Sequence, residues 1–182
     1  AVQIAHDAGA RVAVHSMADG ASDAVAAGVD SIEHGPFLTE DDIRTLARRG
    51  GAWVPTVGNM RHWVEALGGE SSGGRLLQAG LDRMEVNLPL AEEVGLIVLA
   101  GSDLAIPHGQ IAEEARLLRQ YGLSDRAATI ATSTAAYDYV GRKDSLTAGS
   151  TADVVFFAEN PYDDVGTLDR PELIIHRGQV VE

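Results

Sequence analysis

The sequence predicts an α/β protein in which parallel strands alternate with helices and a short all-β segment follows. Two apolar, β-branched runs at residues 11–14 and 29–32 flank an alanine-rich stretch of helical composition, and a histidine follows each run. A strand, a helix and a second strand in this order make the two strands parallel and adjacent. Near the C-terminus, β-rich runs follow one another without an intervening helix.

Composition excludes several classes of function. The chain has 182 residues, 45% of them hydrophobic, which suffices for one domain with a real core. Its net charge of −13 argues against nucleic acid and anionic membrane surfaces as partners. The absence of cysteine excludes disulfides and thiolate metal sites. No apolar run reaches the length of a transmembrane helix, so a cytoplasmic setting is the default expectation.

The N-terminal third of the chain contains three predicted helices. Residues 1–9 are typical of the last turns of a helix, ended by Gly9, with no strand before it; we therefore expect the chain to be the C-terminal portion of something longer. Residues 21–27 form the second helix, with Gly28 as its stop. The third begins at Thr39, a capping residue followed by acidic residues, and Gly50 ends it.

The middle of the chain is harder to interpret. Residues 52–57 predict a third strand, and the glycine-rich stretch 58–74 is predicted to be irregular. A loop of that length at the end of a strand can act as a lid or contact the substrate, which makes Arg61 and His62 candidate substrate-binding residues. The alternative is a disordered segment without function. Residues 76–94 predict a helix that Pro89 bends or breaks.

The fourth strand and the elements after it complete the pattern. Residues 96–103 are almost continuously apolar, as in a strand buried on both faces, and they end in Asp103. Helices are predicted at 110–120 and, as one helix or a pair, at 124–139. Strands are predicted at 152–157, 173–176 and 179–181.

Three polar residues occupy equivalent positions at the ends of predicted strands: His15, His34 and Asp103. The carboxyl ends of parallel strands meet at one edge of a sheet, where α/β folds build their sites. Two imidazoles and one carboxylate match the ligand preferences of zinc and similar divalent metals. A single histidine here is more often a satisfied core residue, and Asp103 could instead cap the next helix, although Pro107, His108 and Gly109 separate it from that helix.

Four segments together resemble the C-terminal half of the amidohydrolase superfamily, in particular its imidazolonepropionase-like and Xaa-Pro dipeptidase (prolidase)-like branch. Residues 12–15 look like the fifth barrel strand, 31–35 (SIEHG) like the sixth, 99–103 like the eighth, and 149–156 (GSTADVVF) like re-entry into the β-sandwich. The resemblance implies the C-terminal half, strands five to eight, of a (β/α)8 TIM barrel over residues 1–145. Residues 146–182 would be the C-terminal part of a composite β-sandwich.

The resemblance also implies roles for individual residues. His15 and His34 match two histidine ligands of one metal, and Asp103 matches the aspartate that binds the other metal and serves as general base. His108 lies in a stretch that looks like the substrate-contacting eighth loop. Met17 stands where the branch often has a further histidine, and the first-strand His-x-His and the fourth-strand lysine have no counterpart in this chain.

We therefore expect a metal-dependent hydrolase of a carbon–nitrogen bond, with a divalent metal, most suitably zinc, and a small-molecule substrate. The alternative is a non-catalytic half-barrel with at most a residual metal site. A doubly wound nucleotide-binding domain is a third, poorer option, because no glycine-rich phosphate loop follows a strand. A half-barrel has two open strand edges, so we also expect self-association or a requirement for the absent N-terminal half.

Overall fold

Four parallel strands form the main sheet of the protein, in the order β1-β2-β3-β4 along the chain. The computed structural model describes residues 1–142 and 148–181. The strands are β1 (Ala13–Ser16), β2 (Ser31–His34), β3 (Ala52–Val54) and β4 (Ile97–Val98), and each pairs in parallel with the next. The predicted parallel arrangement is confirmed.

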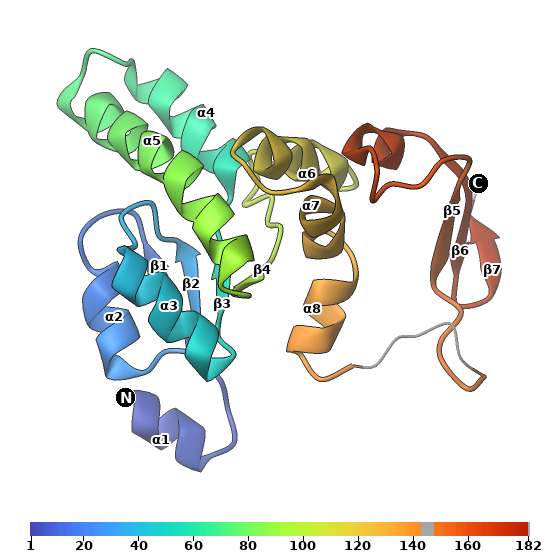
Figure 1. Ribbon diagram of the computed structural model, residues 1–182, viewed down its shortest axis with the longest axis horizontal. Coiled ribbons are helices and arrows are strands. Elements are labelled where there is room, and N and C mark those ends of the chain that lie inside the picture. The colour runs from blue at the N-terminus through green and yellow to red at the C-terminus, as the bar shows by residue number, and fades with distance from the viewer. Residues whose placement is uncertain (143–147, 182) are drawn as a thin grey trace.

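The two faces of this sheet differ in chemistry. Val14, Ile32, Trp53 and Val98 stand side by side in the strand register, and the last three are buried in the main core. Helices α2 (Ala21–Ala27), α3 (Glu40–Arg49) and α5 (Ser72–Glu93) lie over that apolar face (Figure 1). The opposite face carries the small or polar side chains of Ala13, His15, Ser31, Glu33 and Ala52 towards β1 and β2, and the apolar side chains of Val54 and Ile97 towards β4. Ala13 and His15 on this face are exposed.

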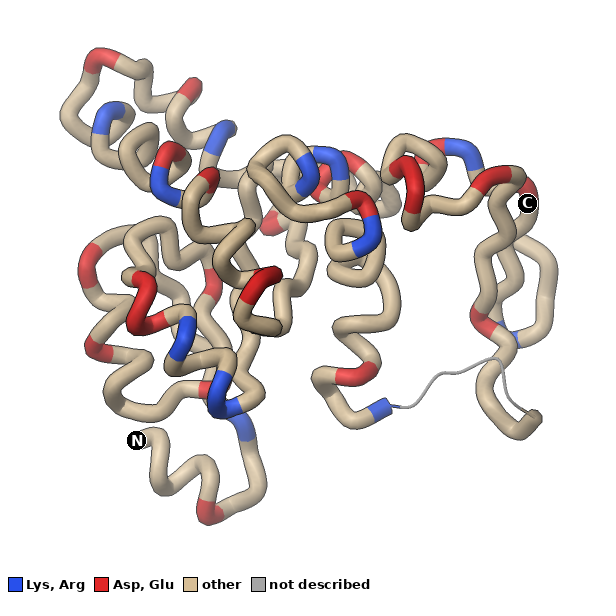
Figure 2. Tube along the Cα trace, viewed as in Figure 1, with Lys and Arg blue, Asp and Glu red and all other residues tan. Residues whose placement is uncertain are grey.

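Helix ends follow the local sequence signals. Gly28 and Gly50 adopt the left-handed conformation just after α2 and α3, as a helix stop requires. Thr39 and Asp42 form a reciprocal capping box at the start of α3, whose first turn is acidic and whose last turn is basic (Figure 2). The remaining helices are α1 (Val2–Asp7), α4 (Val57–Leu67), α6 (Ile111–Gln120), α7 (Asp125–Ala131) and α8 (Thr134–Tyr139).

The structure corrects one prediction for the middle of the chain and part of another. Residues 57–67 are not an irregular loop but the helix α4, which packs along α5 with Met60 fully buried and Val64 half-buried. Its apolar residues Val57, Met60, Val64 and Leu67 recur at alternating spacings of three and four, and the glycines at 68 and 69 only turn the chain towards α5. Of the two outcomes predicted for Pro89, a break does not occur: α5 runs unbroken to Glu93, although proline has no N–H to donate to the carbonyl four residues before it. The ring of Pro89 lies against Gly122.

The fourth strand is much shorter than predicted. Only Ile97 and Val98 pair with β3, and the chain leaves the sheet after the Leu99 N–H, which donates to the Trp53 carbonyl (2.9 Å). The Ala100 N–H donates to the carbonyl of Ala131 at the end of α7 rather than to a strand (3.0 Å). Helices α7 and α8 both contact β4, and the groove between them has a volume of about 310 Å³. The edge that the sequence predicts to be long and apolar is therefore short and flanked by helices.

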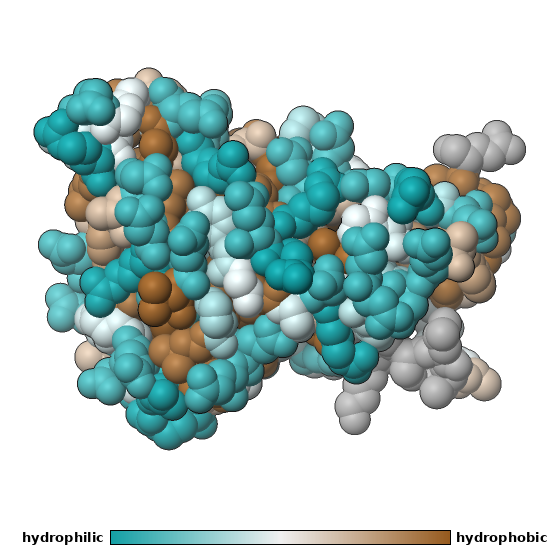
Figure 3. All heavy atoms as spheres, turned by 45° about the horizontal axis from the view of Figure 1, so that its top comes forward, coloured by the Kyte–Doolittle hydropathy of each residue, from teal (hydrophilic) through white to brown (hydrophobic). Residues whose placement is uncertain are grey.

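A separate antiparallel sheet follows, in the order β5-β6-β7. Its strands are β5 (Val154–Phe157), β6 (Pro171–His176) and β7 (Gln179–Val181), and a 3-10 helix, η1 (Val165–Asp169), interrupts the predicted helix-free run. Apolar side chains lie exposed on this sheet, at the end of the molecule seen on the right of Figure 3: Val155, Phe156, Leu173, Ile174, Val180 and Val181. The domain boundary predicted at residues 145 and 146 lies outside the described residues.

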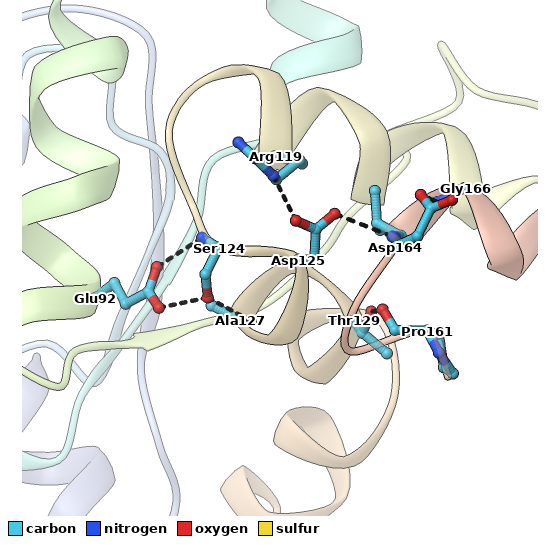
Figure 4. A network of polar contacts seen from close by, with 10 residues as sticks. Glu92, Arg119, Ser124, Asp125, Ala127, Thr129, Pro161, Asp164 and Gly166 are labelled. Carbon is cyan, nitrogen blue, oxygen red and sulfur yellow. Dashed lines mark hydrogen bonds and ion pairs between the residues drawn. The ribbon is translucent and has the colours of Figure 1, made fainter. Parts of the chain in front are cut away.

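Polar contacts attach the segment before β6 to the helices (Figure 4). Asp125 at the start of α7 accepts hydrogen bonds from Arg119 Nε (2.8 Å) and from the Val165 N–H (3.0 Å). The Thr129 hydroxyl donates to the carbonyl of Pro161 (2.8 Å). On the other side of α7, Glu92 of α5 accepts from the Ser124 N–H and hydroxyl. Val165 is itself part of the main hydrophobic core. In the described part of the chain, no helix is long and apolar enough to cross a membrane.

Candidate functional site at the strand ends

His15 and His34 meet at the carboxyl end of neighbouring strands, although simple strand geometry would separate them. His15 is paired in register with Glu33, so these two residues share a face of the sheet, and the next residue should point to the other face. His34, however, has a φ of 64°, which redirects its side chain. The two imidazole rings consequently lie edge to face with centroids 4.6 Å apart.

The surroundings of His34 define which ring nitrogen is free. The Thr56 hydroxyl donates to the carbonyl of Pro55 (2.8 Å), so its lone pairs face His34 Nδ1 at 2.5 Å. This arrangement favours the tautomer in which Nδ1 carries the proton and donates to Thr56, while Nε2 keeps its lone pair. Burial, together with the neighbouring His15, lowers the pKa of His34, and the charge of Asp103 opposes the shift only in part. His34 is thus held neutral near pH 7, with Nε2 as an acceptor.

Asp103 completes an acceptor pair with His34. Its Oδ2 lies 3.6 Å from His34 Nε2, and its side chain is 47% exposed whereas that of His34 is 5% exposed. The Asn59 amide of α4 donates to the Asp103 carbonyl (3.1 Å) and fixes the backbone there. A lone pair and a carboxylate oxygen that face each other repel unless a cation lies between them. The chemistry of these donors therefore fits a divalent metal ion.

Backbone strain is concentrated at the same rim. Among the described residues, four of the five non-glycine residues with positive φ lie here: His34, Thr56, Asp103 and Leu104. The fifth, Arg177, lies in the tight turn between β6 and β7. A β-branched residue such as Thr56, with φ 47° and ψ 53°, adopts this conformation only at a cost of about 1–3 kcal/mol. Clusters of such residues are typical of functional sites.

The three predicted metal ligands contact one another in pairs, but they do not surround a common point as the ligands of a bound metal ion do. His34 contacts both His15 and Asp103, and the three side chains gather at one rim. Among the described residues, no group of three or more histidine, aspartate or glutamate side chains is arranged to hold a metal ion. Their role as ligands stays a prediction.

The predicted substrate-binding residues lie apart from this cluster. Arg61 is half-buried on α4, where its charge acts on Tyr121, and His62 is exposed with its ring against Trp63. His108 is exposed in the segment between β4 and α6. In the described part of the chain, none of the three hydrogen-bonds to His15, His34 or Asp103, and their role in substrate binding also stays a prediction.

Two residues that support the site were missed from the sequence. Thr56 orients the ring of His34, and Glu114 of α6 anchors the start of α4, where its carboxylate accepts from the Val57 and Gly58 N–H groups (2.7 and 2.9 Å). Glu114 did carry a signal. It falls on the buried face of an amphipathic helix with Ala115 and Leu118, where an unpaired charge would be costly.

In comparisons with known proteins, the chain matches parts of longer proteins. No family model matches it. Uncharacterised proteins of Mycobacterium tuberculosis and Mycobacterium bovis are each 33% identical over 185 residues, covering 98% of this chain and 50% of those proteins. The chain spans about half the length of the curated relatives it matches.

The solved structures that this chain matches are also about twice its length. The crystal structure of a Xaa-Pro dipeptidase with methionine bound in its active site matches 100% of this chain and 47% of its own, with a TM-score of 0.80 and 25% identity. A candidate prolidase from Bifidobacterium longum matches at 28% identity and a TM-score of 0.78, with 49% of its chain covered. An ochratoxinase from A. niger shares the fold (TM-score 0.79, 23% identity). The chain therefore corresponds, over its whole length, to about half of an amidohydrolase or prolidase-type structure.

Proposed function

We propose that this chain carries half of the active site of a metal-dependent hydrolase that cleaves a carbon–nitrogen bond of an amide or peptide-like small molecule. The observation that supports this most directly is the acceptor pair of His34 Nε2 and Asp103 Oδ2, at 3.6 Å, on a fold that matches half of a Xaa-Pro dipeptidase. Paired acceptors at the end of β2 and after β4, on one rim of the sheet, are suited to a cation.

The main sheet is then the C-terminal half of a (β/α)8 barrel. Four sequential parallel strands with helices over one face only are what such an excerpt requires. The opposite face, with Ala13 and His15 exposed, would be the interior of the closed barrel. A second copy of the chain or a separate N-terminal half would be needed to close it.

In this proposal His15, His34 and Asp103 hold a divalent metal, most suitably zinc. When bound, such an ion supplies a Lewis acid and lowers the pKa of water towards neutrality. His34 contributes a neutral imidazole whose orientation Thr56 fixes. Asp103 accepts the proton of the attacking water and passes it to the leaving amine; its half-exposed carboxylate is accessible to both.

Zinc binding tests the proposal directly. Titration calorimetry with Zn²⁺ should detect a site in the chain, and His34→Ala and Asp103→Asn should each weaken binding by more than about tenfold, because losing a residue that only orients a metal ligand already costs about that much. His62→Ala is the matched control, because His62 is an exposed histidine outside the cluster. Zinc binding that is unchanged in His34→Ala, or absent from the wild-type chain, would contradict the proposal.

Hydrolysis separates the enzyme from the non-catalytic alternative. The zinc-loaded chain is assayed for release of proline from Xaa-Pro dipeptides such as Met-Pro, a choice suggested by the matched dipeptidase. Activity that is lost in Asp103→Asn supports catalysis by this chain. Zinc binding without any hydrolysis favours a half-barrel that retains only the metal site.

A further inference from the structure

The first turn of α4 touches both sides of the proposed metal site. Thr56, immediately before α4, orients the His34 ring through Nδ1, and Asn59 on the first turn holds the Asp103 carbonyl. A shift of this turn would therefore move both candidate ligands together.

Thr56 occupies the N-cap position of α4 but does not cap the helix. A threonine at this position usually accepts a hydrogen bond from the backbone N–H two or three residues on. Here the left-handed backbone of Thr56 turns its hydroxyl away, and its side chain makes no cap hydrogen bond. The hydroxyl is used instead for His34 and the Pro55 carbonyl. The first N–H groups of α4 consequently need another acceptor.

Glu114 of α6 supplies that acceptor. It is fully buried, and its two carboxylate oxygens accept one hydrogen bond each from the Val57 and Gly58 N–H groups. A Cβ at position 58 would lie 2.7 Å from Ile106 Cδ1 and 3.2 Å from Glu114 Oε2, so both side chains would have to shift to admit it. The lack of a side chain at Gly58 thus lets the carboxylate approach the helix end.

We infer that Glu114 is a positioning residue for the metal site: by capping α4 in place of Thr56, it leaves the threonine hydroxyl free to orient His34. The inference rests on the proposed function, because it assigns Glu114 a role in a metal site. The contacts among Glu114, the first turn of α4 and His34 involve protein groups alone. Glu114 touches neither ligand and acts only through the first turn of α4.

The decisive measurement is the tautomer of the His34 ring, read from long-range ¹H–¹⁵N NMR spectra of the metal-free chain. In the wild type, His34 should be protonated at Nδ1. Glu114→Gln keeps the size of the side chain but presents an NH₂ group to one of the two N–H donors, so part of the His34 population should shift to the Nε2-protonated form. Zn²⁺ affinity should fall about tenfold, the scale for partners that orient metal ligands.

Asp42→Asn is the matched control. Asp42 is also a buried carboxylate that caps a helix, α3, but it lies outside this chain of contacts. It should lower stability without changing the His34 signals. In a Thr56→Val background, where the hydroxyl is gone, Glu114→Gln should have no further effect on the His34 ring.

Two results would overturn the inference. One is a His34 spectrum that does not change in Glu114→Gln, and the other is an equal change in Asp42→Asn. If Glu114→Gln does not fold, Gly58→Ala displaces the carboxylate without removing it and must give the same His34 shift. If the wild-type chain binds no Zn²⁺, the proposed function fails, whereas the tautomer comparison still decides the role of Glu114.

Discussion

Glu114 should make the stability of the protein depend on pH in a direction opposite to that of most carboxylates. Burial raises the pKa of this residue from 4.5 to about 7, and its two backbone hydrogen bonds offset the shift only in part. A carboxyl group whose pKa is raised on folding stabilises the folded state most below its unfolded pKa. That contribution is lost as the pH rises through the folded value.

The size of the effect follows from the two pKa values. A shift from 4.5 to about 7 corresponds to about 3 kcal/mol of unfolding free energy over the whole transition. About 2 kcal/mol of this should be lost between about pH 5.5 and about pH 8. Glu114→Gln cannot ionise, so the free-energy difference between wild type and variant should shrink by that amount as the pH rises.

Urea unfolding followed by tryptophan fluorescence can measure this difference, since Trp53 is fully buried. His34, whose pKa is lowered, contributes the opposite slope, with stability lost as the pH falls below 6.5. The comparison is therefore repeated in a Thr56→Val background, where Glu114→Gln should leave the His34 ring unchanged and the His34 contribution cancels in the difference. The lowered pKa values of Asp30 and Asp42 act below the measured range. A wild-type-minus-variant difference that stays constant with pH would refute the reasoning.

Three further predictions concern packing and assembly. Leu118→Ala removes a fully buried side chain of α6 and should lower the free energy of unfolding by about 2–5 kcal/mol in urea titrations; a loss below that range would mean that the site collapses around the cavity. Gly122→Ala should be destabilising, because φ is 109° and the new Cβ would meet Pro89 Cγ at 2.6 Å; a thermal midpoint equal to that of wild type would contradict this contact. The open edge of β1 should make the chain self-associate or require a second half, and light scattering that finds a stable monomer at micromolar concentration argues against it.

The sequence predicts the sheet well because the deciding signals are local. Gly28 and Gly50 mark helix ends through a backbone conformation that few other residues adopt, and the capping box at Thr39 is readable from spacing alone. Strand order then follows from parallel pairing of consecutive strands. The helix α4 was missed because the glycines around it outweighed the spacing of Met60 and Val64.

The candidate site is only partly readable from sequence. Strand-end positions identify His15, His34 and Asp103, but strict alternation would have placed His34 on the other face of the sheet. The positive φ that returns it to the rim is a tertiary feature. The same holds for Glu114, whose partners are backbone groups 57 and 56 residues away in the chain. Neither feature is encoded by any short stretch of residues.

At the left-handed residues near the strand ends, the substitution that would stabilise the backbone would also remove the functional side chain. At His34, Thr56 and Asp103 the backbone would be more relaxed with glycine, yet glycine offers no imidazole, hydroxyl or carboxylate. A library of this chain screened only for resistance to heat would therefore enrich substitutions at the rim. The most heat-resistant variants would then lack the side chains of the site. Any effort to stabilise this protein should therefore keep these three positions unchanged.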